Sequence, residues 1–86
     1  MNKQWEKPGL EGIVLKEQVR AAVEQYFYHL DGHAVVGLYA MVIAEVEKPL
    51  LEAVLAHTGG NQSKAAKVLG MSRSTLRKKM QQYEIE

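Results

Sequence analysis

The sequence contains no cysteine, which excludes disulfide bonds and thiolate metal sites. Its three histidines are scattered, so they predict no zinc site, and we expect neither a metal nor a cofactor. The longest apolar-rich run, residues 34–46, is interrupted by Gly37 and Glu45, whereas a membrane-spanning helix needs about 20 apolar residues. The first fifteen residues hold no unbroken apolar stretch, so we expect no secretory signal peptide. These absences predict a cytoplasmic protein without membrane contact.

A chain of 86 residues forms one domain at most, with a single modest core. Its 47% apolar content, with seven glycines and two prolines, excludes a disordered or collagen-like chain. No segment alternates apolar and polar residues with the period of a strand, whereas helical spacing recurs along most of the chain. We therefore predict an all-α fold of four helices after an irregular arm over residues 1–14, where Pro8-Gly9 marks a turn.

The charge of the chain is nearly balanced overall but is unevenly distributed. Eleven Lys and Arg face ten Asp and Glu, a net charge of +1, which argues against a chain that coats nucleic acid or an anionic membrane. Residues 1–60 hold five basic and eight acidic side chains, whereas residues 61–86 hold six basic and two acidic ones. The net charge is therefore −3 in the first part and +4 in the second, so the basic excess belongs to the last 26 residues.

Apolar periodicity predicts two longer helices, over residues 15–31 and 34–57. The first half of the second helix is apolar on nearly every face, so it must be buried in protein. Pro49 removes one backbone hydrogen bond and clashes with the preceding turn, which predicts a kink near residues 45–49 or a restart at Pro49.

Two shorter helices are predicted over residues 61–69 and 72–83, joined by a turn at Gly70-Met71. Asn61 and Ser72 stand at the starts of these helices and are residue types that accept a hydrogen bond from the first helical turn. In the last helix an apolar stripe at i, i+4 and i+7 faces inward and consists of Leu76, Met80 and Tyr83.

Two short helices joined by a glycine turn, the second basic from its start, are typical of a helix-turn-helix. Arg73 lies in the first turn of the last helix, where a recognition helix presents side chains to base edges, and could read guanine. The side chains that we expect to hold phosphates are Asn61, Ser63, Lys64, Thr75, Arg77, Lys78 and Lys79.

Two other interpretations of these helices remain open. Basic runs often serve only solubility, so the pattern also fits a helical hairpin with a solvated basic face. A dimeric helical adaptor that binds a protein partner through its last two helices is the alternative from another functional class. Catalysis is not expected, because Ser72, Ser74 and Thr75 lack a neighbouring base and no P-loop lysine is present.

The segment GNQSKAAKVLGMSRSTLRKKMQQY (residues 60–83) resembles the C-terminal motif of the factor for inversion stimulation family, Fis. YFYHLDG (26–32) and LYAMVIAEVEKPLLEAVL (38–55) resemble the core helices of that family, proline included. The resemblance covers about residues 15–83. The last segment is also similar to the DNA-binding end of enhancer-binding activators of the nitrogen-regulator type, which would be expected to stand behind an ATPase domain.

The resemblance implies a bacterial homodimer that binds and bends double-stranded DNA, organises the nucleoid and regulates transcription. Residues 15–58 would form an intertwined dimer core and residues 61–83 the DNA-binding helix-turn-helix. A self-complementary interface also agrees with the excess apolar surface of residues 34–46. The expected dimer-core residues are Phe27, Leu30, Leu38, Tyr39, Val42, Ile43 and Val46.

Matching positions carry the roles of the family onto this chain. Arg73 falls where a base is contacted, with Ser72 beside it, and the phosphate-binding candidates other than Lys64 fall where the DNA backbone is held. Ser72 replaces an asparagine, so it should cap the helix and read bases less well, and Gln81 and Gln82 replace residues that are often basic. Family members that stimulate site-specific recombinases do so through a longer N-terminal hairpin, so the short arm leaves that activity open. Contact with RNA polymerase is a further open alternative.

Overall fold

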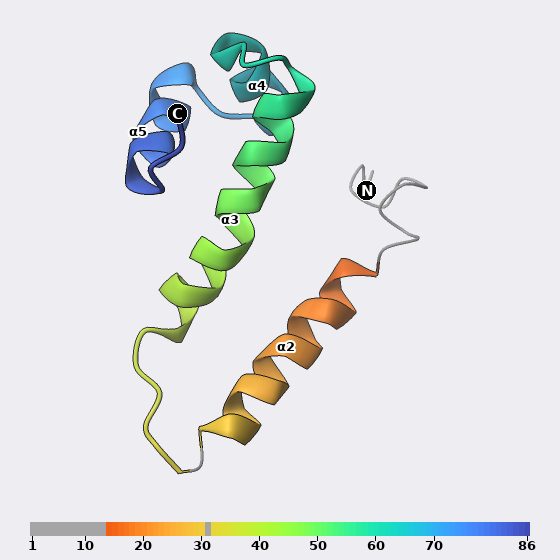
Figure 1. Ribbon diagram of the computed structural model, residues 1–86, viewed down its shortest axis with the longest axis vertical. Coiled ribbons are helices and arrows are strands. Elements are labelled where there is room, and N and C mark those ends of the chain that lie inside the picture. The colour runs from red at the N-terminus through yellow and green to blue at the C-terminus, as the bar shows by residue number, and fades with distance from the viewer. Residues whose placement is uncertain (1–13, 31) are drawn as a thin grey trace. The chain divides into compact units, whose positions relative to one another are not determined.

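The computed structural model describes residues 14–30 and 32–86, and within them the chain forms four α-helices and no strand (Figure 1). The all-α prediction is therefore confirmed, and the predicted arm lies outside the described residues except for Val14. The helices are α2 (Leu15–His29), α3 (Leu38–His57), α4 (Gln62–Leu69) and α5 (Arg73–Gln82).

The chain divides into two compact units, residues 1–35 and 36–86. Helix α2 belongs to the first unit and matches the predicted helix to within two residues at its end. Val19, Val23 and Phe27 follow one another at intervals of four and form its apolar stripe, yet no residue of α2 is buried. No described residue of its own unit therefore buries this stripe.

Helix α3 begins at Leu38. The apolar pattern predicted a start at residue 34, so this part of the prediction is wrong. Gly37 precedes it with φ 76° and ψ 25°, a left-handed conformation that cannot continue a right-handed helix. The apolar run crosses this boundary because residues before the helix, such as Val35 and Val36, are as apolar as the helical ones. Periodicity alone therefore placed the start one turn too early.

Pro49 lies inside α3, and the helix passes through it as one element, so the predicted restart is wrong (Figure 1). Proline has no N–H group, and the carbonyl of Glu45, four residues earlier, therefore receives no helical hydrogen bond. Both residues are exposed, so water can satisfy that carbonyl.

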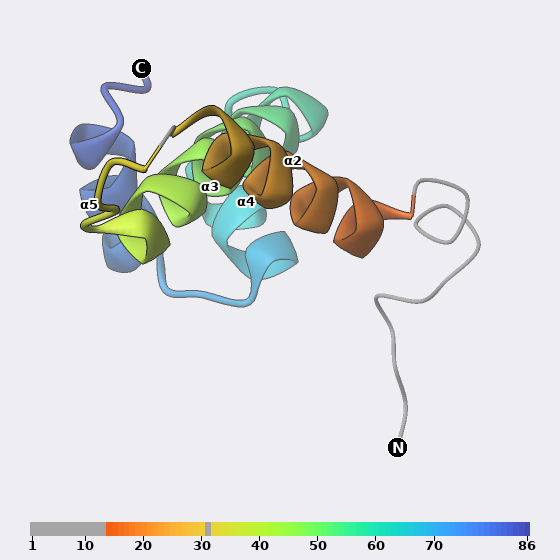
Figure 2. The ribbon, with the colours of Figure 1, turned by 90° about the horizontal axis from the view of Figure 1, so that it is seen from below.

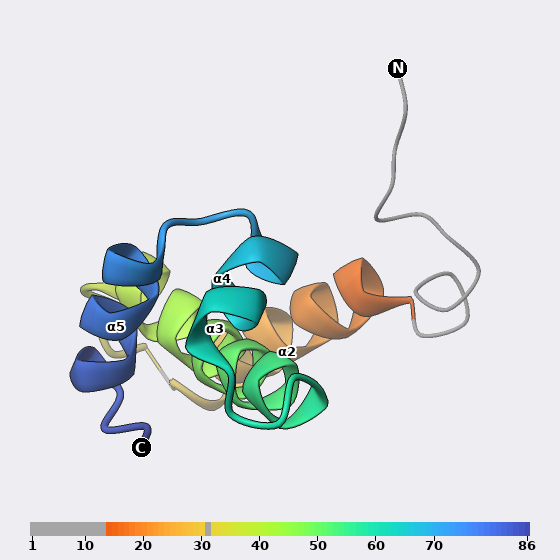
Figure 3. The ribbon, with the colours of Figure 1, turned by 90° about the horizontal axis from the view of Figure 1, so that it is seen from above.

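The second unit has a small core at the C-terminal half of α3, around which α4 and α5 gather (Figures 2 and 3). Leu51 of α3 and Leu76 of α5 are fully buried, and Ala65 of α4 lies between such neighbours with no exposed surface. Small alanines on α4 let the helices approach closely. The buried core consists of Leu51, Leu55, Ala65, Ala66, Leu76 and Met80.

Helix α4 ends in a Schellman motif that makes the turn into α5. The N–H of Gly70 donates to the carbonyl of Lys67 at 3.2 Å, and the N–H of Met71 donates to Ala66 at 3.0 Å. Gly70 has φ 77°, and nothing lies within 4 Å of where a Cβ would stand. Glycine is therefore required here for its backbone conformation and not for space.

Helix α5 ends in the same motif without a glycine. The N–H of Glu84 donates to Gln81 at 3.2 Å, and the N–H of Ile85 donates to Met80 at 2.8 Å. Glu84 takes the left-handed position with φ 56°, which costs a side-chain-bearing residue free energy. Ile85 packs against the core beneath it, which completes the hydrophobic contact typical of this motif.

The first half of α3 and the short segment before it carry apolar side chains that the second unit leaves exposed. Val36 is 92% exposed and Tyr39 is 79% exposed, while Ile43 and Val46 are each more than a third exposed. The sequence predicted that this segment would be buried in protein, and within one chain it is not. No helix among residues 14–30 and 32–86 is long and apolar enough to cross a bilayer.

The left-handed positions after α4 and α5 should respond oppositely to substitution. Gly70→Ala should lower the free energy of unfolding by about 1 kcal/mol, because alanine disfavours positive φ. Glu84→Gly should raise it by up to about 1 kcal/mol, because it relieves the same penalty. Urea denaturation at a fixed protein concentration measures both. Equal destabilisation by the two substitutions would contradict this account.

Candidate nucleic-acid interface

Helices α4 and α5 form a helix-turn-helix in which both helix starts are capped as predicted. The side chain of Asn61 accepts a hydrogen bond from the backbone N–H of Lys64 at 3.0 Å. Ser72 Oγ accepts one from the backbone N–H of Thr75 at 3.1 Å. Each cap satisfies a donor that the first helical turn would otherwise leave unpaired, so the caps fix where both helices begin.

The Ser72 hydroxyl also orders the hydroxyl groups at the start of α5. It donates to Thr75 Oγ1 at 2.9 Å and lies 3.2 Å from Ser74 Oγ. All three residues are exposed. The start of α5 therefore presents a cluster of hydroxyl groups next to Arg73, held in place from the backbone outward.

The two faces of α5 are sharply different. Leu76 and Met80 point into the core and are buried, and Tyr83 is half-buried after them, as the stripe predicted. Of the residues between them, Arg77, Lys78, Gln81 and Gln82 face solvent, whereas Lys79 is half-buried. Besides Ser72 and Ser74, the exposed polar side chains on the capped helix pair are Asn61, Ser63, Lys64, Lys67, Arg73, Thr75, Arg77, Lys78, Gln81 and Gln82.

The exposed cations have no carboxylate partner within the part of the chain that the structure describes. No ion pair forms there to the solvent-facing basic residues of α5, which are Arg73, Arg77 and Lys78. The same holds for the two lysines of α4. Their charge is therefore available to an external anion. A surface of this kind attracts the phosphates of a nucleic acid.

Lys79 is placed differently from the other predicted phosphate-binding residues. Its Nζ forms an ion pair with Oε2 of Glu47 on α3 at 2.9 Å, and the Tyr83 hydroxyl donates to Oε1 of the same carboxylate at 2.5 Å. The side chains of Lys79 and Glu47 are 29% and 20% exposed, so the pair is half-buried. Glu47 therefore links α3 to α5.

The two donors change the acidity of the groups that they join. The hydrogen bond from Lys79, followed by that from Tyr83, holds the pKa of Glu47 below its ordinary value despite partial burial. The hydrogen bond to the Glu47 carboxylate raises the pKa of the Tyr83 hydroxyl. At neutral pH the carboxylate is therefore ionised and the phenol is protonated, which is the state that the contacts require.

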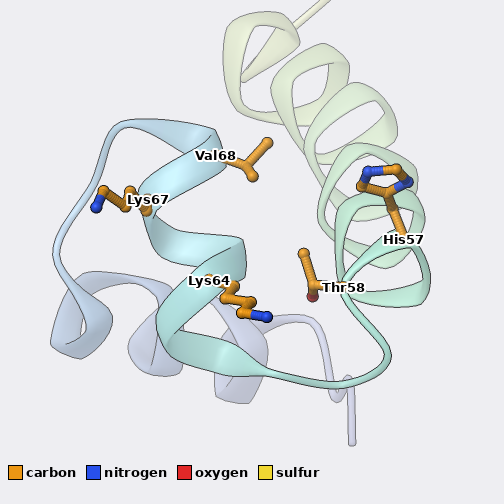
Figure 4. A pocket seen from close by; sticks show the side chains of 5 residues that line it. All are labelled: His57, Thr58, Lys64, Lys67 and Val68. Atoms are coloured by element: carbon orange, nitrogen blue, oxygen red, sulfur yellow. The ribbon is translucent and has the colours of Figure 1, made fainter.

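An open hollow lies between the end of α3 and α4 (Figure 4). It has a volume of about 490 Å³, with His57 on one side and Val68 on α4 facing it. Lys64 and Lys67 stand at its rim and add positive charge to α4. Among the described residues, no three histidine or carboxylate side chains come close enough to hold a metal ion.

The site residue that sequence analysis missed is Glu47. It lies 32 residues before Lys79 and 36 before Tyr83, so no local spacing relates them. One signal was present: Lys79 falls three residues after Leu76 and four before Tyr83, which places it on the inner flank of α5. A lysine on that flank indicates an acidic partner on the neighbouring helix.

Comparison with known proteins adds a family to this geometry. A family model described as bacterial regulatory protein, Fis family, matches residues 42–83. A Fis-like protein of Pseudomonas aeruginosa is 50% identical over 78 residues, which cover 91% of this chain and 75% of that protein. DNA-binding protein Fis of Aliivibrio fischeri and that of Proteus mirabilis are each 48% identical over 69 residues, covering 80% of this chain and 70% of each relative.

The Glu47 contacts should make stability fall in acid. Because the folded pKa of Glu47 lies below its unfolded value of about 4.3, the stabilisation is complete at neutral pH and is lost as the pH falls below that value. The melting temperature of wild type should be higher than that of Glu47→Gln near pH 7, and the difference between them should shrink toward about pH 3. Thermal unfolding over this pH range measures both.

Glu52→Gln is the matched control for this comparison, since it removes the same charge from an exposed position of α3. Its difference from wild type should be small and should change less with pH. Identical pH profiles for the two variants would contradict the role given to Glu47.

Proposed function

Because the chain belongs to the Fis family of bacterial regulatory proteins, we propose that it is a homodimeric DNA-binding and DNA-bending protein. Its field of action would be the nucleoid in the cytoplasm, where it would organise DNA and regulate transcription. The relatives that are named DNA-binding proteins support DNA as the ligand. The helix-turn-helix supports binding through a helix in the major groove. Neither feature suggests an enzyme.

The observation that carries the proposal is the capped helix pair with its outward cations. Arg73 opens α5 and is exposed, at the end of the helix that enters a major groove. A guanidinium there can donate two hydrogen bonds to guanine O6 and N7. Ser72 lies beside it as the second base contact that we propose, with its hydroxyl engaged in the cap.

Phosphate contacts would surround this base contact and set the register of the protein on DNA. They supply affinity that does not depend on sequence and that weakens with salt. Exposed hydroxyl, amide and cationic groups on both helices suit this role. The residues that we propose for it are Asn61, Ser63, Lys64, Thr75, Arg77 and Lys78.

Dimerisation is proposed from the uncovered apolar surface. No residue of α2 is buried, and the first half of α3 exposes aromatic and branched side chains to solvent. Burying this surface against a second copy would remove it from water and provide the two-fold interface most common in homo-oligomers. None of the seven predicted dimer-core residues is buried by its own chain: Phe27, Leu30, Leu38, Tyr39, Val42, Ile43 and Val46.

DNA bending is the finer part of the proposal. Major grooves on one face of straight DNA recur about every 34 Å, so recognition helices of a dimer that lie closer than this require a bent duplex. Deformable, A·T-rich centres would then be favoured without direct contact to their bases. Circular-permutation gel mobility tests this, and a mobility independent of site position would remove the bending claim.

Arg73→Ala and Lys78→Ala should weaken DNA binding in different ways. Arg73→Ala should lose discrimination between sites, about 1–3 kcal/mol, because it removes a base contact. Lys78→Ala should weaken binding to all duplexes alike. It should also reduce the magnitude of the slope of log affinity against log salt by about 0.9 for each phosphate contact that is lost. Gel shifts over a salt series measure both. If wild type does not bind duplex DNA even at low salt, the proposal fails and the adaptor interpretation is favoured.

Ile43→Asp should dissociate the dimer, because an unpaired carboxylate would be buried in the proposed interface. Val68→Asp makes the same change at an exposed apolar residue of α4 outside that interface and should leave the dimer intact. Sedimentation velocity at micromolar concentration distinguishes the two masses. A monomeric wild type, or a dimeric Ile43→Asp variant, would contradict the interface.

A further inference from the structure

We propose that Glu47 is an intramolecular competitor of DNA phosphate that keeps Lys79 from contributing to DNA affinity. The inference rests on the proposed DNA binding and concerns one residue on each of two helices. Lys79 belongs to α5, the helix that would enter the groove, whereas Glu47 belongs to α3, which would not. Their ion pair therefore joins the DNA-binding helix to the helix that supports it.

The geometry makes Glu47 a good substitute for a phosphate oxygen. Its Oε2 lies 2.9 Å from Lys79 Nζ, within the range of a charge-assisted hydrogen bond. The Tyr83 hydroxyl occupies the other carboxylate oxygen and fixes the orientation of the group. Because the pair is half-buried, salt screens it less than an exposed pair. The hydrogen bond from Lys79 lowers the pKa of Glu47, so its carboxylate stays ionised to a more acidic pH than that of an exposed glutamate.

The neighbouring residues show what Lys79 would otherwise do. Arg77 and Lys78 precede it on α5, are exposed and have no carboxylate partner in the described part of the chain. A lysine released on the flank of the same helix has a long, flexible side chain that can reach a phosphate beside the groove. Such a contact would strengthen binding to every sequence by the same factor.

Salt dependence measures this directly, because each phosphate neutralised adds about 0.9 to the magnitude of the slope of log affinity against log salt. Full-length wild type, Glu47→Gln, Lys79→Gln and the double variant would be titrated with a mixed-sequence duplex of about 30 base pairs in NaCl from about 50 to 200 mM. Gln retains an acceptor for the Tyr83 hydroxyl and removes only the charge.

Glu47→Gln should steepen the slope by about 0.9 per DNA-contacting subunit, so that with one such subunit its gain over wild type shrinks about 3.5-fold across this range. Lys79→Gln alone should leave the wild-type slope unchanged, and the double variant should return to it. Glu52→Gln, which removes a charge from the same helix away from Lys79, should keep the wild-type slope.

Two results would overturn the inference while leaving DNA binding established. One is a Glu47→Gln slope equal to that of Glu52→Gln, and the other is a Lys79→Gln slope about 0.9 shallower than wild type, which would show Lys79 on phosphate already. If Glu47→Gln does not fold, the Lys79→Gln measurement alone decides. Absence of binding by wild type would overturn the proposed function, and this inference with it.

Discussion

The C-terminal half of the chain depends on burying Leu51 of α3 and Leu76 of α5 in one core. Helices α4 and α5 have eight and ten residues, lengths at which an isolated helix is marginal in water. Both helices therefore need stabilisation from elsewhere. It comes from packing against α3, from the caps at Asn61 and Ser72, and from the glycine turn between the helices. Because the buried residues fix how α4 and α5 are rotated about their axes, they also determine which side chains of these helices point outward.

Local sequence signals were enough to predict much of the structure of this half of the molecule. Apolar spacing identified the inward residues of α5, and residue chemistry identified both caps and the turn at Gly70, because each depends on neighbours within a few positions. The start of α3 was misplaced, since apolar residues on both sides of Gly37 hide a backbone change that only φ reveals. Of the two outcomes predicted at Pro49, a kink or a restart, the restart is wrong, because one missing hydrogen bond is tolerated where its carbonyl faces water.

The contact between Glu47 and Lys79 could not be predicted from neighbours in the sequence, because it depends on how α5 packs on α3. It also changes how the charge of the chain is to be counted. The sequence assigned six basic residues to the last two helices, and one of them is paired with a carboxylate from the acidic part of the chain. The positive surface is therefore carried by fewer and more outward side chains than composition suggested.

The division of α5 into a buried face and a solvent face has an evolutionary consequence. The residues that hold the helix in the core, Leu76 and Met80, are different residues from those that face outward, such as Arg73 and Lys78. Mutations on the outer face can alter ligand preference with little effect on folding, since they remove no core contact. A lineage can in this way acquire new target sites while its scaffold stays the same.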